Sequence, residues 1–196
     1  MKNLLLTLIL CSAMGLSNIS NAAVISIDFG GQTQYDINDT IYGQLLVSNF
    51  DDTLGAFFAE LNYQPINLAL INWQFGNGFD DGFGSYQFNN HNHAVGTLNL
   101  EDYSDFSADV DILNANQGNE FILASFSFQA LNTGQHTLSL NAQNTGLIDF
   151  DNNDVNAQFS NGSFNVSRQA HVSEPTSMLI FIGALALLMV NRQRMA

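Results

Sequence analysis

The regular alternation of apolar and polar residues along the middle of the chain is the feature that most constrains its fold. Between residues 24 and 167, apolar side chains recur at every second position in short runs, among them 25–29, 41–47, 57–63, 122–128, 138–140 and 164–166. Because successive side chains of a β-strand point to opposite faces, each run predicts a strand with one buried and one solvated face. In the run 122–128, the pattern places Ile122, Ala124, Phe126 and Phe128 in the core and Leu123 on the opposite face.

Turn-forming residues separate these runs. Clusters rich in Asn, Asp, Gly and Thr lie at 36–39, 49–53, 132–134, 152–154 and 161–162, and such clusters commonly end strands. No window carries a convincing apolar stripe at the 3.6-residue spacing of an amphipathic helix. Many short strands with frequent turns predict an all-β chain with a single antiparallel β-sandwich over residues 23–167.

The first 22 residues have the organisation of a secretory signal peptide. Lys2 supplies a positive start, residues 4–10 are continuously apolar, and small residues at 20 and 22 mark a cleavage site. We therefore expect residues 1–22 to be removed during export. Cys11, the only cysteine, lies within this segment, so the domain is expected to contain no disulfide.

The C-terminal segment is also apolar. Residues 178–190 carry no polar side chain and are followed by Arg192 and Arg194. This run gives about 20 Å of helix, less than the roughly 30 Å of the hydrocarbon core. Arginines after an apolar run favour a cytoplasmic C-terminus. We expect residues 178–196 to form a short membrane helix with a basic tail, joined to the domain by a linker at 168–177.

That linker contains Val172-Ser173-Glu174-Pro175 just before the apolar run. The order of this motif, a short apolar helix and a basic cluster resembles the PEP-CTERM sorting signal, with Ser173 in place of the first proline. The resemblance implies that an exosortase, a membrane transpeptidase, cuts near the motif. It also implies delivery through the inner membrane to the cell surface or extracellular matrix of a Gram-negative bacterium, often one that forms biofilms. The alternative is a plain single-pass anchor.

Segments of the alternating region resemble the cohesin-like β-sandwich, a jelly roll related to carbohydrate-binding modules. The resemblance rests on residues 61–65 (LNYQP), on Leu68 and Leu70 after them, on 121–134, and on 149–166. It implies a cohesin-like fold across most of 24–167. Cohesins bind dockerins in cellulosomes. In sorted surface proteins the same fold occurs without an established partner. An immunoglobulin-like sandwich is the competing fold.

The charge of the domain excludes one class of partner. Between residues 23 and 171 the chain has seventeen acidic residues and a single basic one, Arg168. Such a surface repels phosphate backbones, so nucleic-acid binding is excluded. The same charge suits high solubility or binding of divalent cations.

The segment 73–93 interleaves aromatic residues with Gly, Asn and Asp. Its sequence predicts a long loop whose candidate ligand-binding residues are Trp73, Phe75, Phe79 and Tyr86. Aromatic rings stack on the apolar faces of sugars and amides bind hydroxyl groups, so this composition favours a glycan site. The alternative is a glycine-rich strand pair whose rings seal the edge of the sandwich.

Asp149, Asp151 and Asn153 form a candidate calcium site. Their oxygen-bearing side chains recur at every second position, and calcium binds six to eight such oxygens. The run lacks the glycine and glutamate of a complete EF-hand loop, and an acidic hairpin turn is the alternative. No other cofactor is expected.

The sequence contains no recognised catalytic motif, so we do not expect an enzyme. The interpretation is an exported surface or matrix protein whose sandwich binds exopolysaccharide. The alternative is a structural or adhesive module that binds other surface proteins.

Overall fold

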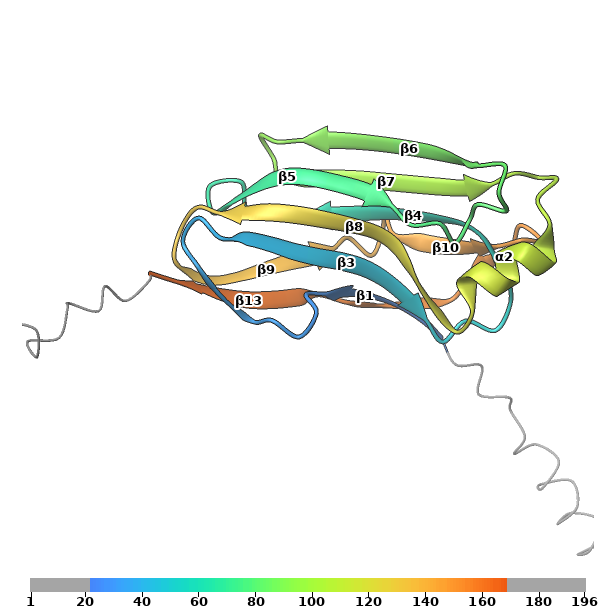
Figure 1. The fold of residues 1–196 in the computed structure, drawn as a ribbon, viewed down its shortest axis with the longest axis horizontal. Helices are drawn as coiled ribbons and strands as arrows, with labels where there is room; N and C mark the ends of the chain where they lie inside the picture. The colour runs from blue at the N-terminus through green and yellow to red at the C-terminus, as the bar shows by residue number, and fades with distance from the viewer. Residues whose placement is uncertain (1–21, 169–196) are drawn as a thin grey trace, which may run out of the picture.

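The computed structural model describes residues 22–168, which form a two-layered β-sandwich with one short helix (Figure 1). The first sheet contains, in order, β12 (Ala157–Ser160), β1 (Ala23–Asp28), β3 (Thr40–Ser48), β8 (Glu120–Ala130) and β5 (Leu68–Phe75). The second contains β11 (Asp154–Val155), β10 (Gly146–Asp149), β4 (Leu54–Asn62), β9 (Gly134–Leu140), β13 (Gly162–Ser167) and β2 (Gln34–Asp36), and extends from β4 through β7 (Thr97–Ser104) to β6 (Ser85–Asn92). The prediction of an all-β sandwich is confirmed.

Strand pairing is mostly antiparallel, with two parallel exceptions. β1 pairs in parallel with β12, and β13 pairs in parallel with β2. Each exception involves a short strand at the margin of a sheet, β12 or β2. Each of these short strands pairs with a strand that is distant from it along the chain. The prediction of an antiparallel sandwich therefore holds for the long strands and not for these margins.

The core lies between the two sheets, as the alternation requires. β3 and β7 bury every second side chain over most of their length. Phe57 of β4 and Phe128 of β8 are completely buried and belong to one continuous apolar cluster. Burying aromatic side chains of this size contributes a large share of the stability of such a domain.

β8 departs from simple alternation at one point. Its register with β3 passes from Ala124 opposite Leu45 to Ile122 opposite Leu46, which leaves Leu123 as an extra residue. Such a bulge shifts the following side chains to the other face. Leu123 is therefore buried and Ile122 half-exposed, so the prediction for these two residues was wrong.

The helix α2 (Val110–Gln117) was not predicted. Its N-cap is Asp109, whose carboxylate accepts hydrogen bonds from the backbone N–H groups of Asp111 at 3.0 Å and Ile112 at 3.4 Å. Only Leu113 and Gln117 of this helix are buried. One apolar and one polar residue do not form an apolar stripe, which is why the pattern gave no helical signal.

The segment 73–93, predicted as a long loop, consists mainly of two strands. β5 lies at the edge of the first sheet and β6 at the edge of the second, so residues 76–84 cross from one sheet to the other. Within this crossing, the Asp80 carboxylate accepts hydrogen bonds of 2.7 Å from the backbone N–H groups of both Gly82 and Gly84. These two glycines have positive φ angles of 103° and 102°, which favour glycine.

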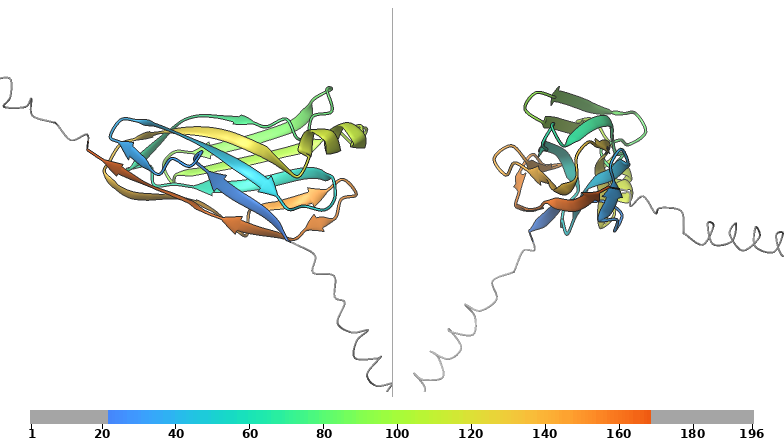
Figure 2. Two further views of the ribbon diagram at one scale, coloured as in Figure 1. Left: turned by 60° about the horizontal axis from the view of Figure 1, so that its bottom comes forward. Right: turned by 90° about the vertical axis from the view of Figure 1, so that its left-hand side faces the viewer.

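The two ends of the described chain lie far apart. In Figures 1 and 2, β13 ends at one end of the long axis, while α2 and the start of β1 lie toward the other. The first 21 residues of the predicted signal peptide, the sorting motif with Arg192 and Arg194, and the predicted membrane helix at 178–196 lie outside the described residues. Among residues 22–168, no helix is long and apolar enough to cross a membrane.

Candidate docking groove

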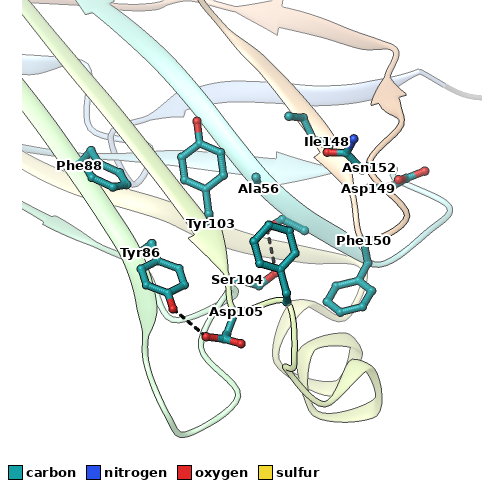
Figure 3. Close-up of a pocket in the computed structure, with 12 residues that line it drawn as sticks. Ala56, Tyr86, Phe88, Tyr103, Ser104, Asp105, Ile148, Asp149, Phe150 and Asn152 are labelled. Carbon is teal, nitrogen blue, oxygen red and sulfur yellow. Dashed lines mark hydrogen bonds between the residues drawn. The ribbon is translucent and has the colours of Figure 1, made fainter.

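The outer face of the second sheet carries a groove of about 490 Å³ (Figure 3). Its walls come from β4, β6, β7 and β10 and from the loops that follow β7 and β10. Most of the lining residues are aromatic or aliphatic, and the set comprises Gly55, Ala56, Tyr86, Phe88, Tyr103, Ser104, Asp105, Phe106, Ile148, Asp149, Phe150 and Asn152.

Strand register explains why the groove lies there. Tyr86 of β6 pairs with Tyr103 of β7, Tyr103 pairs with Ala56 of β4, and Ala56 pairs with Ile148 of β10. Residues paired in this way share one face of a sheet. The row therefore has large side chains at its ends and an alanine in its middle, so Ala56 forms a floor between higher walls.

The loop after β7 projects an aromatic ring beside the groove. Asp105 accepts hydrogen bonds from the backbone N–H of Ser107 at 2.8 Å and from its hydroxyl at 2.6 Å, and the Tyr86 hydroxyl donates to Asp105 at 2.9 Å (Figure 3). The bonds from Ser107 lower the pKa of Asp105, and Asp105 raises the pKa of Tyr86. Between these anchored neighbours, Phe106 is 100% exposed.

Other apolar rings of the groove are also unusually accessible. Phe88 is 58% exposed and Tyr86 is 53% exposed. Single exposed apolar residues are common in soluble proteins, but several on one hollowed face indicate a binding surface. Asp105 and Asp149 add carboxylates to the lining, so the groove combines an apolar floor with negative charge.

The structure separates the four aromatic residues predicted to bind a ligand, and only Tyr86 lies in the groove. Trp73 is half-buried and meets the His91 ring edge-on at 5.8 Å between centroids. Phe75 and Phe79 pack around the buried Phe57. Phe79 is only 1% exposed, so its assignment to a binding site was wrong: its ring fills the core.

The candidate calcium residues lie at the turn after β10. Both oxygens of the Asp149 carboxylate already accept hydrogen bonds from Asn153, from its backbone N–H at 2.7 Å and its side-chain amide at 2.9 Å. These bonds lower the pKa of Asp149. Within residues 22–168, no three His, Cys, Asp or Glu side chains are grouped so as to hold a metal ion. The carboxylate of this acidic turn is thus hydrogen-bonded within the turn itself. Calcium binding stays a prediction.

Most of the groove, including Phe88, Tyr103 and Phe106, was not predicted from the sequence. A partial signal was available, because the alternation that buries Leu98 and Leu100 places Tyr103 on the opposite face. That signal cannot show which strands lie beside β7, and a groove depends on those neighbours.

Comparisons with known proteins bear on the fold. No family model and no curated protein matches the chain. Among solved structures, a type II cohesin domain from the cellulosome of Acetivibrio cellulolyticus matches with a TM-score of 0.64 and 14% identity, covering 74% of this chain and 96% of that one. The chain has the cohesin fold.

Two further cohesins give similar matches. The seventh ScaB type I cohesin from Pseudobacteroides cellulosolvens has a TM-score of 0.61 and 17% identity, covering 78% of this chain and 97% of that one. A cohesin from a type I cohesin–dockerin complex of Clostridium thermocellum has a TM-score of 0.60 and 12% identity, covering 75% and 100%. These structural matches show the shared cohesin fold, which was preferred over the immunoglobulin-like alternative. Sequence identities this low show nothing finer than the fold.

Proposed function

We propose that this chain is an exported surface or matrix protein whose sandwich docks a protein partner in the groove between β6 and β10. The observation that carries the proposal is the concentration of exposed aromatic rings there, with Phe106 fully exposed beside an alanine floor. Leaving such a surface in water is unfavourable, and a partner's apolar side chains would cover it. The cohesin from Clostridium thermocellum, which shares the fold, was solved in complex with a dockerin.

The charge of the chain specifies the partner further. Arg168 is the only Lys or Arg between residues 22 and 168, and the groove itself contributes Asp105 and Asp149. A partner that inserts apolar anchors and carries Lys or Arg beside them would gain both buried area and electrostatic steering. We therefore expect a basic polypeptide segment whose binding weakens as salt increases.

The position of the groove suits a tethered module. The loops after β7 and β10 lie at the α2 end of the sandwich, whereas β13 ends at the opposite end (Figure 1). If the segment after β13 attaches the protein to a membrane or to the matrix, the groove points away from the attachment. A partner could then reach it without crossing the tether.

The sequence favoured exopolysaccharide as the ligand, and one observation keeps it as the second candidate. Tyr86 and Tyr103 lie side by side on the groove face, and such rings can stack on sugars. Retention of the sandwich on exopolysaccharide, lost in Tyr86→Ala, would support this glycan function instead.

The expected result for the groove is a selective loss of partner binding in Phe106→Ala. This ring makes no contribution to the core, so the variant should fold normally yet bind an isolated basic partner at least about tenfold more weakly, as for an interface hot spot. Phe83→Ala is the matched control, because Phe83 is 94% exposed and does not line the groove. Titration calorimetry with a purified secreted partner measures both. Equal binding by the two variants would exclude the groove.

Export and sorting form a separate part of the proposal. The sequence of the tail supports cleavage near Glu174 and Pro175, so protein recovered from the cell surface should lack residues 1–22 and 178–196. Intact-mass spectrometry of the recovered protein measures both ends at once. A mature protein that keeps 178–196 would establish the plain membrane anchor instead, and Pro175→Ala should prevent the cleavage if an exosortase performs it.

A further inference from the structure

β6 is exposed on both of its faces, whereas a strand that packs on a core buries every second side chain. It lies at the margin of the second sheet, outermost in Figures 1 and 2, and pairs only with β7 among the described strands. Every residue from Tyr86 to Asn90 is exposed, although the side chains alternate between two faces. The strand therefore projects beyond the core, with both faces and its outer edge open to water.

Other margins of the described sheets have features that discourage pairing with another chain. β2 and β11 have three and two residues and carry Asp36 and Asp154. β12 has four residues. β5 is longer, but a bulge between Leu70 and Asn72 interrupts its register. Short length, charge and bulges are the usual protections of sheet edges.

β6 lacks all of these protections. It has eight residues, SYQFNNHN, with no acidic or basic residue of the Asp, Glu, Lys or Arg type and no proline. Its register with β7 runs without a break from Ser85 opposite Ser104 to Asn92 opposite Thr97. A regular row of backbone N–H and C=O groups is thus available along the outer edge.

The charge of the chain indicates what can occupy this edge. Two copies, each with a net charge of −14, repel one another over most of their surfaces, and an uncharged strand is where they approach at least cost. Asn, Gln and aromatic side chains are also self-complementary when like strands pair. A second copy satisfies both conditions through a two-fold interface, the commonest symmetry of homo-oligomers.

We propose that two copies of this chain pair edge to edge through β6, in antiparallel orientation about a two-fold axis. This pairing joins the two second sheets into one continuous sheet and leaves the groove face of each copy open. The assembly therefore presents two docking grooves, which strengthens attachment to a multivalent partner. The inference rests on the edge of β6 and does not depend on what the groove binds.

The dependence on salt concentration distinguishes this contact from the groove, because binding of a basic partner in the groove should weaken as salt increases. Raising the salt concentration from about 20 mM to about 500 mM screens the repulsion between acidic copies, so self-association should strengthen. Residues 22–168 are suited to the measurement because their two sheets enclose one continuous core. Sedimentation velocity at several protein concentrations gives the dimer dissociation constant at each salt concentration.

Asn90→Lys is the test variant. It adds a charge to an exposed β6 position that makes no side-chain hydrogen bond within residues 22–168, and it should weaken the dimer about tenfold or more, as edge lysines do. Asn114→Lys, on the exposed side of α2, makes the same change in net charge away from the edge. Both lysines lower the overall repulsion, so a weaker dimer in Asn90→Lys alone must come from the edge.

Hydrogen exchange supplies a readout that does not depend on a variant. In the dimer, the outward-facing amides of β6 should exchange more slowly as protein concentration rises, while those of α2 should not change. A monomer at every concentration and salt would overturn the proposal. So would a dimer that Asn90→Lys leaves intact and Phe106→Ala dissolves, because that result places the contact in the groove.

Discussion

Gln117→Leu should lower the free energy of unfolding by about 3 kcal/mol or more, since it removes a buried hydrogen-bonding group and leaves its partners unpaired. Gln117 is completely buried at the end of α2. Its carbonyl accepts from the backbone N–H of Leu54 at 2.8 Å, and its amide donates to the carbonyls of Leu54 at 2.7 Å and Gly78 at 3.0 Å. One side chain thus connects the helix, β4 and the crossing segment.

Urea denaturation of residues 22–168 measures the effect as a lower midpoint with an unchanged slope. Asn114→Leu is the control, because Asn114 lies on the same helix with an exposed side chain and makes the same change from amide to leucine. Its effect should stay within about 0.5 kcal/mol. Equal midpoints for the two variants would mean that the hydrogen bonds of Gln117 do not stabilise the folded chain.

Gln117 also illustrates what the sequence could not reveal. Its three bonds reach β4 and residue 78, which are distant along the chain, so its role depends on the tertiary fold. The sandwich itself was predictable because core strands such as β3 and β7 carry their own alternation, which needs no knowledge of their neighbours. The edge strand β6 carries none, since all of its residues from Tyr86 to Asn90 are exposed, and its segment was predicted as a loop. The bulge at Leu123 was not, because a bulge is defined by the partner strand.

The candidate site was less predictable than the fold for the same reason. The groove exists because Ala56, Tyr86, Tyr103 and Ile148 form one row across four strands. Composition drew attention to the aromatic segment 73–93 and to Tyr86, which lines the groove, while its predicted role in ligand binding stays a prediction. The same composition also included Phe79, because an aromatic residue in a core and one on a surface look alike in a sequence.

One inward-facing position of β7 carries an acidic residue where the alternation would place an apolar one, and this residue should have a large effect on stability. β7 buries Leu98, Leu100 and then Asp102, which is 0% exposed. One oxygen of Asp102 is 3.3 Å from the side-chain amide of Gln87, and the other has no hydrogen-bond partner among the described residues. Burial raises the pKa of Asp102 from 3.8 to about 6, against the opposing effect of neighbouring donors, Ser85 first and Gln87 next.

This shift has a definite sign for stability. Between pH 3.8 and about 6, the folded chain holds a proton on Asp102 that the unfolded chain releases. Stability from this group is therefore complete below pH 3.8 and is lost as the pH rises through about 6. Above about pH 7, keeping the charged carboxylate buried costs about 3 kcal/mol.

Asp102→Asn should therefore stabilise the folded chain by about 2–3 kcal/mol at about pH 7.5, because asparagine is neutral and can still accept from Gln87. Below pH 3.8, where the native carboxyl is protonated, the gain should disappear. Asp51→Asn removes the same charge from an exposed position and controls for the general repulsion of an acidic chain. Urea midpoints across this pH range measure the difference. A gain that is equal in both variants, or that persists at low pH, would mean that Asp102 is not destabilised by its burial.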